Sequence, residues 1–238
     1  MLKTEHLTKH YKGSGKGITD LSIHVKPGDL YAFIGHNGAG KTTALKAIVG
    51  IHEFDGGEIY IDGISIKEDA LACKRKLAYI PDNPDLYEYL TGIQYLNFVA
   101  DVFGIAADVR EERIATYADA FEITPSLGDL ISTYSHGMRQ KLAIISALIH
   151  EPRLLVLDEP FVGLDPKAAV TVKGYMRELC ARGGAVFFST HVLEVAERLC
   201  NKVAIVKDGR LVRAGEMSEI VREGETLEEI FLEVAADE

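Results

Sequence analysis

The feature that most constrains this chain is the loop "GHNGAGKTT" at residues 35–43, which places three glycines around Lys41. The apolar run at 30–34 before it is typical of a buried strand, and apolar residues recur at helical spacing from Leu45 to Val49 after it. At such a strand-to-helix junction the first helical N–H groups have no partner and the helix dipole is positive. We therefore expect the loop to bind an anion.

The spacing within the loop narrows that anion to a phosphate group. Gly35 is followed after four residues by Gly40, Lys41 and Thr42, as in phosphate-binding loops. We predict that the Lys41 ammonium reaches the outer phosphates of a nucleotide and that the Thr42 hydroxyl holds Mg²⁺. The alternative is a flexible glycine-rich turn, which would not require the lysine or the threonine. The loop residues predicted to bind the nucleotide are Gly35, His36, Asn37, Gly38, Ala39, Gly40, Lys41, Thr42 and Thr43.

The length, net charge and cysteine content of the chain limit its domain organisation and its possible partners. The 238 residues are enough to bury a full core, in one large domain or two small ones. The formal net charge of −10 repels a polyphosphate backbone, so we expect no nucleic-acid partner. Cys73, Cys180 and Cys200 form no Cys-x-x-Cys motif, which is typical of reduced packing residues rather than of disulfides or a zinc site.

The chain contains no predicted membrane span or signal peptide. No apolar run approaches the roughly 20 residues that cross a bilayer, and the first residues, "MLKTEHLTKHYKG", are polar. We therefore expect a protein that is soluble by itself. Near the other end Leu227, Ile230, Phe231 and Val234 follow helical spacing, and we predict a docked amphipathic helix with a frayed last turn.

The segments around the loop predict two kinds of sheet and a helical insertion. "TEHLTKHY", "ITDLSIHVKPGD" and "GGEIYIDG" read as strands, and the final Asp-Gly is a hairpin signal, so we predict a small antiparallel sheet. The apolar runs in "RLLVLDEP", "AVFFSTH" and "KVAIVKDGR" alternate with helical sequence, which indicates a mainly parallel α/β sheet. Residues 84–150 repeat apolar side chains at helical spacing, at 93, 96, 99 and 102 and again at 114, 117, 118 and 121.

Polar residues end two of the buried strands. Asp158 and Glu159 follow "LLVL", and open α/β sheets bind ligands at the carboxyl ends of their strands. We predict that Asp158 orients Mg²⁺ through its water shell and that Glu159 polarises the attacking water as a general base. His191 ends the next strand and could bond a γ-phosphate. Taken singly, the acids also fit a solvated strand end with a helix cap, and the histidine fits a surface position.

A second predicted anion site lies in "YSHGMRQKLAIISALIHEP". Ser135 can cap a helix there, and Gly137 leaves bare N–H groups in its first turn. Two copies arranged head to tail would close each phosphate loop with the partner's Ser135 segment and bury ATP at a twofold interface. A simple capped helix is the alternative.

Together these motifs resemble those of the ATP-binding subunits of ABC transporters, over nearly the whole chain. The phosphate loop, "YSHGMRQ", "LLVLDEP", "GLD" with Asp165, and His191 stand in the family's order. The resemblance implies an α/β, P-loop NTPase fold of the ABC ATPase type, with a mainly parallel core sheet, an antiparallel β subdomain and an inserted α-helical subdomain. It implies one domain, 1–238, in which 1–83 and 151–215 form the core, 84–150 the helical subdomain and 216–238 a C-terminal helical tail.

The resemblance also implies roles for single residues. Tyr11 would stack on adenine, Lys41 would hold the phosphates, and Mg²⁺ would bind at Thr42 and Asp158. Glu159 would be the catalytic base and His191 the sensor of the γ-phosphate. The nucleotide-binding residues implied outside the loop are Tyr11, Ser135, Gly137, Met138 and Asp165.

The chain also departs from the family pattern. The signature is usually Leu-Ser-Gly-Gly-Gln, whereas Tyr134, His136 and Met138 stand here for the leucine, the first glycine and the glutamine. This form resembles subunits of drug, antibiotic and peptide exporters, so we expect export. Asp82 stands where the family has a glutamine, and it could reach the metal through water.

The function implied is that of an ATP-hydrolysing subunit that powers export of an unidentified drug, antibiotic, peptide or lipid. It would act with an integral-membrane permease, as a homodimer or as a heterodimer with a second ABC ATPase, on the cytoplasmic face of the cell membrane. One alternative is a soluble ABC-type ATPase of an assembly machine such as iron–sulfur-cluster assembly. Another is a nucleotide-binding regulator without turnover, against which Glu159 and His191 argue. A chromosome or DNA-repair ATPase would need a long coiled coil, and no sustained heptads are present.

Overall fold

The computed structural model describes residues 1–11, 13 and 16–236, and these form two compact units. The first unit contains 1–79, 153–160 and 176–238, and the second contains 80–152 and 161–175. Each unit therefore combines segments that are distant in the sequence.

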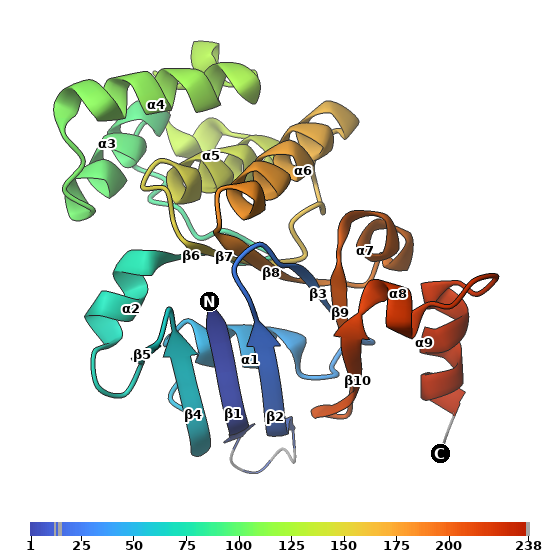
Figure 1. Ribbon diagram of the computed structural model, residues 1–238. Coiled ribbons are helices and arrows are strands. Elements are labelled where there is room, and N and C mark those ends of the chain that lie inside the picture. Colours follow the sequence, from blue (N-terminus) through green and yellow to red (C-terminus); the bar gives the residue numbers. More distant parts are fainter. Residues whose placement is uncertain (12, 14–15, 237–238) are drawn as a thin grey trace. The chain divides into compact units, whose positions relative to one another are not determined.

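The first unit contains an antiparallel sheet of four strands in the order β2-β1-β4-β5 (Figure 1). Its strands are β1 (Leu2–His10), β2 (Gly17–Val25), β4 (Gly56–Ile61) and β5 (Ile64–Ser65). Asp62 and Gly63 connect β4 to β5 with φ angles of 51° and 81°, as a two-residue hairpin turn requires. The predicted antiparallel sheet and its Asp-Gly hairpin are confirmed.

A six-stranded sheet in the order β10-β9-β3-β8-β7-β6 holds the core of the same unit. The strands β3 (Leu30–Ile34), β8 (Ala185–Thr190), β7 (Leu154–Asp158) and β9 (Lys202–Lys207) run parallel. Every residue of β3, β7 and β8 is buried, which explains their continuous apolar sequences. The outer strands are β6 (Leu77–Ile80) and β10 (Arg210–Glu216), and β10 pairs antiparallel with β9. The prediction of a mainly parallel α/β sheet is confirmed.

Helices of the first unit pack on these sheets. Helix α1 (Lys41–Ile48) contacts β1, β2 and β7, so it joins both sheets in one core. The other helices are α2 (Ala70–Lys76), α7 (Leu193–Leu199), α8 (Met217–Ile220) and α9 (Leu227–Ala236). Leu227 and Ile230 of α9 are buried, and α9 contacts α7, which confirms the docked C-terminal helix (Figure 1). Residues 237 and 238, at the end of its predicted last turn, lie outside the described residues.

The second unit is helical. It contains α3 (Gly92–Val102), α4 (Ala107–Ala120) and α5 (His136–Leu148), with 3₁₀ turns at Thr124–Ser126 and Ile131–Thr133. Helix α6 (Pro166–Ala181) begins in this unit, and its residues from 176 belong to the first. The residues predicted as helical at 93, 96, 99 and 102 all lie in α3, whose buried face is carried by Leu96 and Ala100, whereas Val102 is 65% exposed. Across the described residues, no helix is both long and apolar enough to cross a bilayer.

Candidate functional site

The predicted phosphate loop connects the end of β3 to the start of α1 in the first unit. Gly40 precedes the helix with φ of 101°, and no side chain caps the first turn of α1. A Cβ atom at Gly40 would lie 2.9 Å from Gly17 O, and one at Gly35 would lie 2.6 Å from Val206 O. The loop therefore needs glycine at these two positions, and the helix start is left open to an anion.

The Lys41 side chain folds back into this loop. Its Nζ donates a hydrogen bond to Gly35 O at 2.7 Å and another to His36 O at 3.4 Å. Burial lowers the pKa of Lys41, while the carboxylates of Glu159 and Asp158 act in the opposite direction. Lys41 thus places its donors in the curve of the loop, where the sequence predicts the phosphates of a nucleotide.

The carboxyl ends of β3, β7 and β8 bring the remaining predicted residues of this unit together. In the parallel registers, Ile34 pairs with Thr190 and Asp158 pairs with Ser189. Loops that follow these strands therefore meet at one edge of the sheet, as expected for a ligand site in an open α/β fold.

Asp158 is buried at this edge, with 2% of its surface exposed. One of its carboxylate oxygens accepts a hydrogen bond from the Thr42 hydroxyl at 2.7 Å, and the other accepts one from the Ser189 hydroxyl. Thr42 and Asp158 are 116 residues apart in the sequence, and the sheet places their oxygens in direct contact. The structure thus brings together both residues that were predicted to serve a divalent cation in this unit.

Glu159 is held in an unusual backbone conformation. Its φ angle is 48°, in the left-handed region that costs energy for a residue with a side chain. Its N–H group donates to Ser189 Oγ and to the Ser189 carbonyl, both at 3.2 Å. The side chain accepts a hydrogen bond from the His191 N–H at 3.3 Å, lies 3.0 Å from His191 Nδ1, and lies 3.9 Å from Lys41 Nζ.

These contacts define what the arrangement can do chemically. The Glu159 carboxylate is 14% exposed, so it is shielded on most sides yet still reaches solvent. A carboxylate in this position can accept a proton from a water molecule beside the phosphate loop. His191 is 56% exposed, and it can donate a hydrogen bond toward the same water or toward a phosphate.

Sequence reasoning missed Ser189, which is fully buried and contacts both acidic residues. Its position in "STH" at the end of a strand is the only sequence signal, and a serine there has no distinctive spacing. The sequence also gave no sign that the Tyr11 hydroxyl lies 3.0 Å from His52 Nδ1, with the two rings edge to face. Tyr11 is 38% exposed, so its ring can meet a ligand from solvent.

The other predicted site residues, Asp82, Ser135, Gly137, Met138 and Asp165, belong to the second unit. Ser135 caps α5, as predicted, by accepting a hydrogen bond from the Met138 N–H at 3.3 Å. Asp165 accepts a hydrogen bond from the Ala168 N–H at 2.8 Å and forms an ion pair with Lys141 at 2.7 Å. The hydrogen bond from Lys141 holds the pKa of Asp165 below its usual value.

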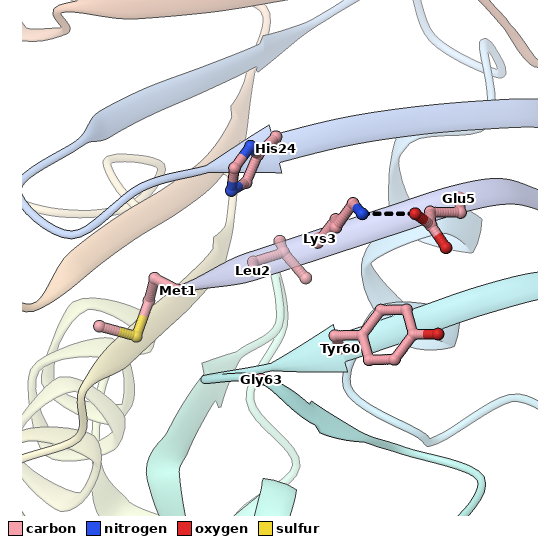
Figure 2. A pocket seen from close by; sticks show the side chains of 7 residues that line it. All are labelled: Met1, Leu2, Lys3, Glu5, His24, Tyr60 and Gly63. Atoms are coloured by element: carbon pink, nitrogen blue, oxygen red, sulfur yellow. Dashed lines mark ion pairs between the residues drawn. The ribbon is translucent and has the colours of Figure 1, made fainter.

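A separate hollow of about 320 Å³ lies on the antiparallel sheet of the first unit (Figure 2). Figure 2 shows the ion pair between Lys3 and Glu5 on β1, with His24 and Tyr60 on the flanking strands. None of the predicted nucleotide-binding residues lines this hollow, whose lining residues are Met1, Leu2, Lys3, Glu5, His24, Tyr60 and Gly63.

Comparison with protein families agrees with these motifs. A family model described as "ABC transporter" matches residues 18–162. A second model, described as an AAA domain of a putative AbiEii toxin, matches the shorter segment 130–197.

Individual relatives and solved structures agree as well. The uncharacterized ABC transporter ATP-binding protein YhcH of Bacillus subtilis is 34% identical over 89% of this chain and 68% of its own length. The linearmycin resistance ATP-binding protein LnrL of the same organism is 30% identical over 92% of this chain and 70% of its own. A solved "ATP binding subunit of ABC transporter" superposes with a TM-score of 0.94, at 34% identity and 99% coverage of both chains. A dimeric post-hydrolysis structure of the ATP-binding cassette MJ0796, bound to ADP and Pi, shares the fold with a TM-score of 0.83 at 23% identity, over 91% of this chain and 99% of that one.

Proposed function

This chain belongs to the ABC transporter family as an ATP-binding subunit with the ABC ATPase fold, and from that premise we propose that it hydrolyses ATP to power export through a separate membrane subunit. The observation that carries the proposal is the cluster at the carboxyl ends of β3, β7 and β8. There a buried lysine, a hydroxyl–carboxylate pair and a histidine-bonded glutamate lie beside one phosphate loop. A protein that only bound nucleotide would not need the glutamate and the histidine.

In this proposal the loop residues from Gly35 to Thr43 hold the phosphates of ATP. The N–H groups at the start of α1, which no side chain caps, and the ammonium of Lys41, which bonds Gly35 O in the same loop, supply the donors. Tyr11 stacks on the adenine, which its exposed ring allows. Lys41 Nζ also donates to the carbonyls of Gly35 and His36, which keep the ammonium beside the loop that receives the phosphates.

The residues present also fit Mg²⁺. A magnesium ion takes few protein ligands, prefers hard oxygens and completes its shell with water and substrate phosphates. The contact of Thr42 Oγ1 with a carboxylate oxygen of Asp158 offers two such oxygens next to the phosphate loop. We assign the ion to Thr42 and Asp158 of the first unit, while the role of Asp82, which belongs to the second unit, stays a prediction from the sequence. When bound, Mg²⁺ neutralises charge that develops on the phosphates.

Glu159 is the general base in this proposal, because its carboxylate is fixed by the His191 N–H and faces Lys41. It takes the proton of the attacking water, and His191 bonds the same water or the γ-phosphate. The φ of 48° at Glu159 sets the direction in which its side chain leaves the end of β7, where it meets His191 and Lys41.

A second ATPase chain completes the site in this proposal. Ser135, Gly137, Met138 and Asp165 of one copy contact the ATP held on the phosphate loop of the other. The cap by Ser135 leaves its hydroxyl at the start of α5, where the N–H groups favour an anion. The dimeric MJ0796 cassette supports such a pairing. The second chain is an identical copy or a different ABC ATPase, and a dimer formed by the purified chain alone would identify it as a copy.

The membrane partner is proposed to dock on the helical unit. Tyr87, Tyr89 and Phe98 expose 45%, 75% and 45% of their surfaces, and Tyr87 contacts the rings of Tyr89, Tyr95 and Phe98. Exposed aromatic patches of this kind mark interaction surfaces. Docking there would hold the chain at the cytoplasmic face of the membrane. The export direction is supported by the signature "YSHGMRQ" and by the name of the relative LnrL.

The experiment that tests this function is light scattering after size-exclusion chromatography on the Glu159→Gln variant, with and without Mg-ATP. Removing the base should keep binding and stop hydrolysis, so ATP should convert monomers to dimers. A monomer under saturating ATP, also in the presence of the membrane subunit, would contradict the paired site. The wild-type chain must hydrolyse ATP under the same conditions, and Lys41→Ala must not.

A further inference from the structure

His136 is one of the three residues by which this chain departs from the usual signature, and its side chain lies against Gly163. A Cβ atom built on Gly163 would lie 2.3 Å from His136 Cδ2 and 2.6 Å from His136 Nε2. The imidazole of His136 therefore occupies the space that any side chain at position 163 would need. Gly163 also has a φ of 78°, which a residue with a side chain adopts at a cost.

Two further contacts hold the same segments together within the second unit. A Cβ atom built on Gly137 would lie 2.8 Å from Gly163 O, so the backbones at 137 and 163 are in close contact. One turn further along α5, Lys141 forms an ion pair with Asp165 at 2.7 Å, and Lys141 is only 15% exposed. The first turns of α5 and the 161–165 loop are thus joined by three contacts: the His136 ring against Gly163, the backbone contact between 137 and 163, and the ion pair between Lys141 and Asp165.

We propose that His136 and Gly163 form a matched pair that fixes the 161–165 loop on the start of α5. This inference rests on the proposed function, in which Ser135 and Asp165 of one chain complete the ATP site of the other. His136 is then a positioning residue, because it sets where Asp165 lies relative to Ser135 without itself needing to touch the nucleotide. Glycine at 136 would leave this space empty, and a side chain at 163 would displace the imidazole.

If His136 and Gly163 form a matched pair, removing the imidazole should compensate for a side chain added at position 163. Gly163→Ala should force the imidazole away from the loop and lower kcat for ATP by about tenfold to a hundredfold, because small misplacements of catalytic groups have large effects. Removing the imidazole in the double variant His136→Gly/Gly163→Ala should restore kcat to within about threefold of His136→Gly alone. The affinity of the single chain for ATP should change little in all three variants, because the phosphate loop is intact.

Gly104→Ala is the matched control for backbone strain. Gly104 lies in the same unit with a φ of 67°, and a Cβ atom there would meet nothing within 4 Å. This variant carries the cost of a left-handed alanine without the clash, so its kcat should stay at the wild-type value. If Gly163→Ala does not fold, the double variant decides: a folded, active double variant supports the pair, and failure of both overturns it.

A second measurement does not depend on hydrolysis. In protein labelled with ¹³C at histidine Cε1, the His136 resonance is identified by its loss in His136→Gly. It should shift in Gly163→Ala and stay in place in Gly104→Ala. An unmoved resonance, or a double variant as impaired as Gly163→Ala, would overturn the pair. If the wild-type chain does not hydrolyse ATP, the proposed function is contradicted. The resonance shift would still test the contact between His136 and Gly163.

Discussion

The hydroxyl of Ser189 donates a hydrogen bond to the carboxylate of Asp158 and accepts one from the N–H of Glu159 at 3.2 Å. One buried hydroxyl therefore orients the acid assigned to the metal and the acid assigned to the water. Ser189→Ala should remove both contacts and lower kcat about tenfold, with a loss of about 1–3 kcal/mol in the free energy of unfolding. Steady-state kinetics and urea unfolding measure the two effects.

Ser65→Ala is the control for the loss of a buried serine hydroxyl. Ser65 is 7% exposed and lies on β5 of the same unit. Its variant should keep the wild-type kcat. Equal activity losses in the two serine variants would show that Ser189 acts only through general packing.

The sequence predicted the single motifs of this site, but not the contacts between residues of different motifs. The phosphate loop, the strand-ending acids and the Asp62–Gly63 turn have local signatures, because spacing, glycine and apolar periodicity are properties of short segments. The contact between Thr42 and Asp158 depends on the order of the strands in the sheet, which periodicity does not specify. The left-handed conformation of Glu159 is likewise imposed by tertiary contacts, since nothing in the sequence favours it.

Other elements were missed for physical reasons of the same kind. Helix α2 spans only seven residues, "ALACKRK", and buries only Cys73. Its sequence therefore lacks the periodic apolar residues that predict a helix. On α3, the apolar residues at 93, 96, 99 and 102 are three residues apart, whereas a helix turns once in 3.6 residues. Val102, the last of them, therefore lies away from the buried face. The second unit also takes in 161–175, a segment that lies beyond the predicted helical insertion in the sequence.

Thr42 offers a test of the cation assignment. Its hydroxyl bonds Asp158 at 2.7 Å, so Thr42→Ala removes one of two neighbouring oxygens while leaving the loop backbone unchanged. We expect the Mg²⁺ concentration that half-saturates hydrolysis to rise by about tenfold or more, because Mg²⁺ depends on few protein ligands. Titration of Mg²⁺ at fixed ATP measures this. Thr42→Ser keeps the hydroxyl and should stay near the wild-type value; an equal rise in both variants would contradict the assignment.

A buried ion pair away from the site stabilises the first unit. Lys202 Nζ lies 2.8 Å from Asp29 Oδ2, and the side chains are 10% and 7% exposed. Lys202→Met should lower the free energy of unfolding by about 3 kcal/mol, because it leaves the Asp29 carboxylate buried without its cation. Nucleotide binding by the folded variant should be unchanged. As a contrast, Arg198→Ala breaks a pair with Glu194 that is 79% and 71% exposed and should cost at most about 0.5 kcal/mol.

His150, two residues beyond the end of α5, makes the stability of the second unit sensitive to acid. Its ring stacks on Phe103, with centroids 3.7 Å apart and planes within 2°, and its Nδ1 is buried with no hydrogen-bond partner among the described residues. Burial lowers the pKa of His150 from 6.5 to about 4; a hydrogen bond with the residue's own backbone acts in the opposite direction, and the nearby Arg113 lowers the pKa further. In the folded chain this ring therefore stays neutral at pH 5.

The sign of the pH effect follows from this shift. Above pH 6.5 the ring is neutral in both states and contributes no pH dependence. Below pH 6.5 the imidazole is protonated in the unfolded chain but stays neutral in the folded chain. The free energy of unfolding therefore falls between pH 6.5 and about 4. His150→Phe removes this loss and should gain about 2 kcal/mol relative to wild type between pH 7.5 and pH 5. Urea unfolding at both pH values measures the difference, with the exposed His10→Phe as control. A gain that is the same at both pH values would show that the histidine is not held neutral.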